Sequence, residues 1–93
     1  MLGPENYAKL VQRFQDEMEA LLVWFEADET SDAAEIAAKS HKVAGSAAVF
    51  GATGVRDRLR QIETAAKAGE VSGVEALAAD LSEVWAVSRD RLL

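Results

Sequence analysis

His41 is the residue of this sequence with the clearest chemical potential, because it is the only histidine among 93 residues and cysteine is absent. A chain without thiols has no disulfide, no thiolate nucleophile and no cysteine-ligated zinc, and one imidazole cannot form a histidine metal cluster. Imidazole has an ordinary pKa of about 6.5, so a substantial neutral fraction can act as a nucleophile at pH 7. We therefore centre the chemistry on His41 and expect no metal site.

The position of His41 on its helix predicts that the ring is at least partly exposed. Ile36, Val43, Ala47 and Phe50 recur on one face, which defines the direction of the core. At about 100° per residue, His41 lies about 140° from Ile36. Two alternatives to a functional histidine are a hydrogen-bonded core residue and a solvated surface residue without a role.

The residues that share the helix surface with His41 have almost no side chain. Positions three, four and seven residues away are neighbours on a helix, and here they are Ala34, Ala37, Ala38, Ala44, Gly45 and Ala48. An ordinary solvent-facing stripe would carry glutamate, lysine and glutamine at several of these positions. Gly45 costs about 0.5–1 kcal/mol relative to alanine inside a helix, which favours a role in the close approach of an external group. We predict a docking surface for another protein around an open imidazole.

The charge of the chain is unevenly distributed. The net charge of −6 disfavours nucleic acid as a partner, because binding phosphates requires clustered lysine and arginine. Residues 36–60 nevertheless hold five bases and one acid, a net charge of +4, and this segment contains the histidine. The bases are Lys39, Lys42, Arg56, Arg58 and Arg60. Cations in this segment could hold phosphate oxygens beside the ring.

Apolar residues at helical spacing predict four helices, at about residues 4–27, 32–50, 55–68 and 72–92. Residues 28–31 are a polar connection, Asp32 with Glu35 resembles a capping box, and Ser72 with Glu75 forms a second one. Gly51 and Gly69 are placed to end the second and third helices. The predicted core residues are Tyr7, Leu10, Val11, Phe14, Met18, Leu21, Leu22, Phe25, Ile36, Val43, Ala47, Phe50, Val55, Leu59, Ile62, Ala66, Val74, Leu77, Ala78, Leu81, Val84, Trp85 and Leu92.

Four amphipathic helices with short connections predict an all-α fold, an antiparallel up-and-down four-helix bundle that forms one domain over residues 1–93. The sequence shows no apolar run long enough to cross a membrane and no pattern of a signal peptide. We therefore expect a soluble, cytoplasmic protein, and the small bundle favours a monomer.

The segment from Ser40 to Ala52 resembles the signature of histidine-phosphotransfer (HPt) domains. The histidine is followed four residues later by Gly45, then by Ser46 and Ala47, and Gly51-Ala52 lies ten and eleven residues after it. Downstream, Leu59, Ile62-Glu63, Ala65 and Lys67-Ala68-Gly69 are similar to the third helix and the glycine turn of that family. The resemblance covers about residues 36–70 by motif and the whole chain by helix order.

The resemblance implies a phosphorelay carrier of two-component signalling, without catalytic turnover of its own. His41 would be phosphorylated on its solvent-facing ring nitrogen, accepting the group from the aspartate of a response-regulator receiver domain and returning it. A hybrid histidine kinase is a second candidate partner. The receiver would supply Mg²⁺, so no cofactor is expected on this chain. A polar side chain on the third helix, Glu63 or Gln61, would hydrogen-bond the other ring nitrogen. The positive segment fits electrostatic steering toward an acidic receiver pocket.

One position departs from the family pattern, which has a lysine three residues after the histidine, where this chain has Ala44. Lys42, Arg56 and Arg58 are the candidates to replace it, although Lys42 lies about 100° around the helix from His41. The remaining alternative is a phosphate without a cationic neighbour. The departure motivates an alternative function: a helical module that binds receivers without carrying phosphate. A histidine-kinase fragment is disfavoured, because the chain is too short for an ATP-binding domain and has no glycine-rich phosphate loop.

Overall fold

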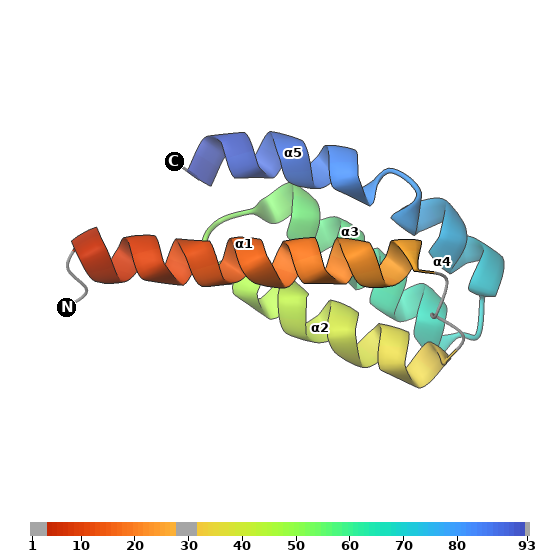
Figure 1. Cartoon of the computed structure of the whole chain (residues 1–93). Helices are drawn as coiled ribbons and strands as arrows, with labels where there is room; N and C mark the ends of the chain where they lie inside the picture. The colour runs from red at the N-terminus through yellow and green to blue at the C-terminus, as the bar shows by residue number, and fades with distance from the viewer. Residues whose placement is uncertain (1–3, 28–31, 93) are drawn as a thin grey trace.

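A computed structural model describes residues 4–27 and 32–92 of the chain, and this part contains five helices. They are α1 (Pro4–Glu26), α2 (Ala33–Val49), α3 (Thr53–Lys67), α4 (Val71–Ala78) and α5 (Leu81–Leu92). Figure 1 shows the chain reversing direction after α1, after α2 and after α3, with α4 and α5 following one another along the last leg. The all-α class is confirmed, whereas the predicted connection at residues 28–31 lies outside the described residues.

The prediction of one continuous fourth helix is wrong, because the structure has two helices here, α4 and α5, separated at Ala79 and Asp80. In a continuous helix the carbonyl of Leu77 would accept a hydrogen bond from the amide of Leu81. Here that carbonyl accepts a hydrogen bond of 2.9 Å from Nη1 of Arg58 on α3, and the same nitrogen pairs with the Asp80 carboxylate. The carbonyl of Asp80 then begins the hydrogen-bond ladder of α5. A tertiary contact therefore stabilises the break.

The start of α2 and the ends of α2 and α3 are determined by the residues at those positions. Asp32 caps α2, since its carboxylate accepts from the amides of Ala34 and Glu35, as predicted. Gly51 and Gly69 end α2 and α3 with φ of 70° and 72°, the left-handed conformation that glycine adopts without strain. The amides that follow return to carbonyls of the last turn, a Schellman arrangement.

The predicted capping box at Ser72 is wrong. Helix α4 already begins at Val71, and its N-cap residue is Glu70, whose side chain makes no capping hydrogen bond. The turn at Gly69 sets this start, because the amide of Glu70 is bound to the carbonyl of Ala65 at 2.9 Å. Ser72 therefore lies inside the first turn of the helix.

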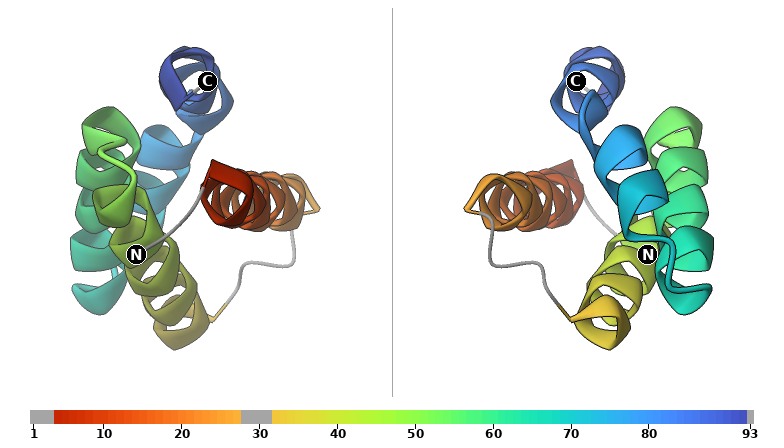
Figure 2. Two further views of the ribbon diagram at one scale, coloured as in Figure 1. Left: turned by 90° about the vertical axis from the view of Figure 1, so that its left-hand side faces the viewer. Right: turned by 90° about the vertical axis from the view of Figure 1, so that its right-hand side faces the viewer.

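The core explains how α2 and α3 come to present a site together. These two helices form the most extensive contact in the molecule, since small residues on both allow their backbones to approach closely. Helices α1 and α5 cover the pair with large side chains, and Phe14 of α1 packs edge-on against Trp85 of α5 and stacks on Phe50. Figure 2 shows α1 between α2 and α5 when the molecule is viewed along its length. The buried apolar residues are Val11, Phe14, Met18, Leu21, Ile36, Ala37, Val43, Ala44, Ala47, Ala52, Val55, Leu59, Ile62, Ala65, Ala66, Val74, Leu81 and Trp85.

Most of the predicted core is confirmed, but the edges of the bundle differ from the prediction. Leu10, Leu22, Phe25, Leu77 and Val84 are half-buried, and so are Phe50 and Ala78. Tyr7 is exposed near the beginning of α1, where its ring still contacts Phe50 edge-on. The side chain of Leu92 lies outside the described residues. None of the described helices is long and apolar enough to cross a membrane.

Candidate functional site

His41 lies in the middle of α2 and points away from the core, as its helical phase predicted. Its side chain is 77 % exposed, so the alternative of a hydrogen-bonded core histidine is wrong. The helix continues for two turns on either side of it, which fixes the backbone and the direction in which the ring extends. An external group can therefore reach the imidazole without any change in the fold.

Glu63 of α3 binds one nitrogen of that ring. Nδ1 of His41 lies 3.1 Å from Oε2 and 3.3 Å from Oε1 of Glu63. Because α2 and α3 are antiparallel and share a long contact, residues 22 positions apart in sequence meet here. The hydrogen bond expected from the resemblance is present, and its partner is Glu63, while Gln61 is exposed and takes no part in it. Among the described residues, no hydrogen-bond partner lies at Nε2.

Lys67, one helical turn after Glu63, binds the same carboxylate. Its Nζ lies 2.9 Å from Oε2, while the Glu63 side chain is only 13 % exposed. The hydrogen bond from Lys67 lowers the pKa of Glu63 below its ordinary value; burial opposes this effect, and the hydrogen bond with His41 adds to it. The carboxylate is therefore ionised at neutral pH.

An ionised carboxylate can only accept hydrogen bonds, so Nδ1 must carry the proton that it shares with Glu63. In the neutral ring the other nitrogen, Nε2, then holds a free lone pair. Because the ring is exposed and Nδ1 is occupied, Nε2 is the nitrogen that can act as a nucleophile toward a group arriving from solvent. The arrangement is suited to covalent transfer at a single, defined atom.

The predicted docking surface needs a correction at two of its six positions. Ala34, Ala38, Gly45 and Ala48 are exposed, but Ala37 and Ala44 are 6 % and 3 % exposed and belong to the core. Helix α2 is covered by α1 on one side and by α3 on the other, so its buried arc is wider than the line from Ile36 to Phe50. Ala37 and Ala44 lie on that wider arc.

Gly45 and Val49 extend the exposed surface along α2. A Cβ atom built on Gly45 would meet nothing within 4 Å, so packing inside the bundle does not require a glycine there. Val49 is 77 % exposed at the end of the helix, and sequence analysis did not include it in the surface. It lies about 40° around the helix from Gly45, at about 100° per residue. The surface beside His41 is therefore flat, apolar and accessible.

The bases predicted to support a phosphate are directed elsewhere. Arg56 pairs with its neighbour Asp57 at 3.1 Å, and Arg58 is engaged with the break between α4 and α5. Lys42 is exposed and lines a hollow with Trp24 on the α1 side of α2. The structure thus brings His41, Glu63 and Lys67 together. Lys67 was not among the predicted site residues, although its spacing of four from Glu63 is the signal of a helical ion pair.

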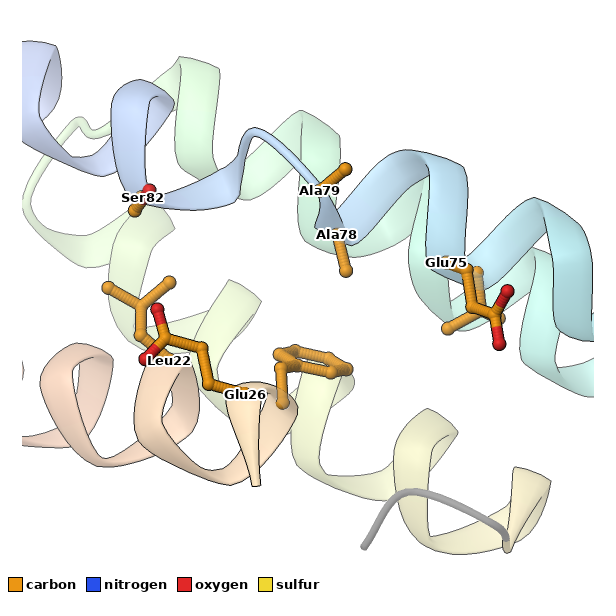
Figure 3. Close-up of a pocket in the computed structure, with 8 residues that line it drawn as sticks. Leu22, Glu26, Glu75, Ala78, Ala79 and Ser82 are labelled. Atoms are coloured by element: carbon orange, nitrogen blue, oxygen red, sulfur yellow. The ribbon is translucent and has the colours of Figure 1, made fainter. Parts of the chain in front are cut away.

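Several hollows of the described bundle have linings that do not include His41. Figure 3 shows one of about 320 Å³, where Leu22 and Glu26 of α1 face Glu75 and Ala78 of α4. His41 does not line it. Within residues 4–27 and 32–92 no three metal-binding side chains gather into a group. Nε2 of His41 therefore lies on an open helical face and not in an enclosed pocket.

The fold and the site together define a small helical module that exposes one oriented histidine beside an apolar face. The family model of the Hpt domain matches residues 7–87, and the chain belongs to this family. Membership makes it a phosphotransfer module of two-component signalling, a family of phosphocarriers that interact with receiver domains and kinases. No curated protein and no solved structure matches the chain significantly.

Proposed function

We propose that this chain is a phosphorelay carrier and that Nε2 of His41 is the atom that holds the phosphoryl group. The observation that carries the proposal is the pairing of Nδ1 with Glu63 in a ring that is otherwise exposed. The resemblance of the segment around His41 to the HPt signature supports the proposal, and so does the exposure of the ring, which leaves Nε2 accessible. The chain supplies the nucleophile and its orientation, and it completes no catalytic cycle alone.

The transfer step is a displacement at phosphorus. The Nε2 lone pair forms an N–P bond to the phosphoryl group of a receiver aspartyl phosphate. The P–O bond to the aspartate breaks, and its electron pair stays on the aspartate carboxylate. The Nδ1 proton remains in the hydrogen bond with Glu63 throughout. The reverse displacement returns the group to an aspartate, with the receiver supplying Mg²⁺.

The exposed residues Ala34, Ala38, Gly45, Ala48 and Val49 form the docking face in this proposal. Small side chains have little rotamer entropy to lose, so burying them against a partner has a low entropic cost. The face is continuous with the ring of His41 on the same helix. A receiver can therefore pack against α2 while its aspartyl phosphate reaches Nε2.

The test is transfer from a phosphorylated receiver domain, with isotopically labelled phosphate, to the wild-type chain and to His41→Gln. We expect an acid-labile label on the wild type and none on the variant, because phosphohistidine is labile in acid and glutamine offers no nucleophile. Receivers encoded alongside the chain in its source genome are the donors to use. A label on His41→Gln, or an unlabelled wild type with every such receiver, would contradict the proposal.

A second candidate function is a receiver-binding module that does not carry phosphate. The observation that favours it is Ala44, a buried and uncharged residue where the family has a lysine. This function predicts that His41→Ala binds a receiver as tightly as the wild type and that neither protein becomes labelled. Measuring binding and transfer with the same receiver separates the two functions.

A further inference from the structure

One oxygen of Glu63 is shared between two donors. Oε2 lies 3.1 Å from Nδ1 of His41 and 2.9 Å from Nζ of Lys67. The two donors come from different helices, His41 from α2 and Lys67 from α3. The carboxylate between them is largely buried, whereas both donors extend into solvent. The three side chains therefore form one connected polar group at the edge of the α2–α3 contact.

The binding of Lys67 to the same Glu63 oxygen has two physical consequences for the imidazole of His41. Lys67 binds the same carboxylate oxygen as the ring, so Glu63 has less freedom to rotate away from Nδ1. Lys67 also offsets the negative charge of Glu63, which would otherwise repel the phosphoryl oxygens that arrive at the same ring. The first effect favours the tautomer with the proton on Nδ1 and the lone pair on Nε2, and the second favours the approach of a phosphoryl group to Nε2.

We propose that Lys67 is a positioning residue for the phosphorylation of His41, acting through the Glu63 carboxylate that it shares with the imidazole. The role of Lys67 rests on the proposed function of His41 as the phosphoacceptor. In this chain the cation of the site comes from α3, four residues after Glu63, and not from position 44 of α2. The buried, neutral side chain of Ala44 and the other engagements of Arg56 and Arg58 agree with this assignment.

The direct test is the position of the ring proton in Lys67→Met and Lys67→Arg. Because His41 is the only histidine, nitrogen NMR of the folded chain at pH 8 gives one imidazole, and its two nitrogen shifts report the tautomer. We expect the Nδ1–H form to predominate in the wild type, to decrease in Lys67→Met and to be retained in Lys67→Arg. This measurement needs no partner protein.

The matched control is Lys39→Met. Lys39 also pairs with a glutamate four residues away, Glu35 at 4.0 Å, and it lies about 200° around α2 from His41 at about 100° per residue. Its loss removes the same charge and the same kind of helical pair at a distance from the ring. We expect the tautomer of Lys39→Met to equal that of the wild type.

The rate of chemical phosphorylation gives the second readout, with phosphoramidate as the donor. Its P–N bond breaks and ammonia leaves while Nε2 forms the new N–P bond, so no receiver takes part. We expect Lys67→Met to react about threefold to fivefold more slowly, the size of effect that one partly exposed ion pair produces, and Lys67→Arg and Lys39→Met to react at the wild-type rate.

Two results would overturn the role of Lys67. One is a Lys67→Met variant with the wild-type tautomer and phosphorylation rate. The other is a Lys39→Met variant whose Nδ1–H tautomer and phosphorylation rate decrease as much as those of Lys67→Met. Failure of the proposed function has a different signature. The wild-type chain would then accept nothing from phosphorylated receivers, while the NMR contrast between Lys67→Met and Lys67→Arg would still be present.

Discussion

Glu63 of α3 reaches across to α2 and holds Nδ1 of His41 at 3.1 Å, which orients the single histidine of the chain from a neighbouring helix. The contact depends on the antiparallel pairing of α2 and α3, whose small residues bring the two backbones close together. A charge-assisted hydrogen bond of this kind contributes about 1.5–3 kcal/mol. The orientation of the His41 ring is therefore a property of the helix pair, and not of α2 alone.

Glu63→Ala should lower the rate of phosphorylation of His41 by about tenfold, because the ring loses the acceptor that keeps its proton on Nδ1. Glu63→Gln should fall between the wild type and Glu63→Ala, since its amide oxygen still accepts a hydrogen bond but carries no charge. Initial rates of transfer from one phosphorylated receiver measure the effect. Equal rates for Glu63→Ala and the wild type would show that the contact has no part in the transfer.

The lowered pKa of Glu63 makes a contribution to stability that depends on pH. A carboxyl group whose folded pKa lies below its ordinary value of 4.5 stabilises the fold above that value. The contribution is lost as the pH falls through the lower, folded value. Urea unfolding of the wild type and Glu63→Gln should thus show a difference that is full at about pH 5 and shrinks on acidification. A difference in unfolding free energy that grows toward pH 3 would contradict this pH dependence.

Arg58 is expected to stabilise the fold and not to act in phosphotransfer. Arg58→Met leaves the carbonyl of Leu77 and the carboxylate of Asp80 without their partner, and should lower the free energy of unfolding by about 1–3 kcal/mol. For a domain of this size each kcal/mol lowers Tm by about 4–8 °C. Arg60→Met, which removes an exposed charge from the same helix, is the control and should change Tm little. Equal Tm values for the two variants would argue against a structural role of Arg58 at the break.

The break also illustrates which features of the fold can be predicted from sequence. Helical phase placed His41 on the surface, because the direction of a side chain follows from local backbone geometry alone. The break at Ala79 and Asp80 contains no glycine or proline, and it depends on Arg58, 19 residues before Leu77 in sequence. No local pattern reports such a tertiary contact, so the sequence predicted a continuous helix.

The site shows the same contrast between features that follow from local sequence and features that depend on tertiary contacts. The family pattern indicated Glu63 or Gln61 as the partner of the ring. Burial of Ala37 and Ala44 depends on a second helix packing against α2, which the phase of one apolar line cannot reveal. Lys67 has the spacing of an ion pair with Glu63 in sequence. Whether that pair faces His41 depends on the register between α2 and α3, which only the folded structure provides.

The open space at Gly45 allows the docking face to be tested without disturbing the bundle. Gly45→Leu should keep or raise stability, by up to about 1 kcal/mol, because leucine is the better helix former and a Cβ at this position meets no other atom. The same side chain should obstruct a receiver that packs against α2. We expect transfer from a phosphorylated receiver to fall more than about tenfold, which corresponds to 1.4 kcal/mol.

The reaction with phosphoramidate provides the internal control, since this small donor does not need the docking face. Its rate should be nearly the same for Gly45→Leu and the wild type. Ala76→Leu, a substitution at another exposed position, on α4, should leave both rates unchanged. A Gly45→Leu variant that accepts phosphate from a receiver at the wild-type rate would place the docking face elsewhere.

The most direct test of the account is to identify the atom that carries phosphate after transfer from a receiver. Phosphorus and nitrogen NMR of the labelled chain distinguishes a phosphoryl group on Nε2 from one on Nδ1, and either from an acyl phosphate. We expect one phosphorylated species, with phosphorus bonded to Nε2 of His41 and Nδ1 still hydrogen-bonded to Glu63. Phosphorus on Nδ1, or on any side chain other than His41, would contradict it.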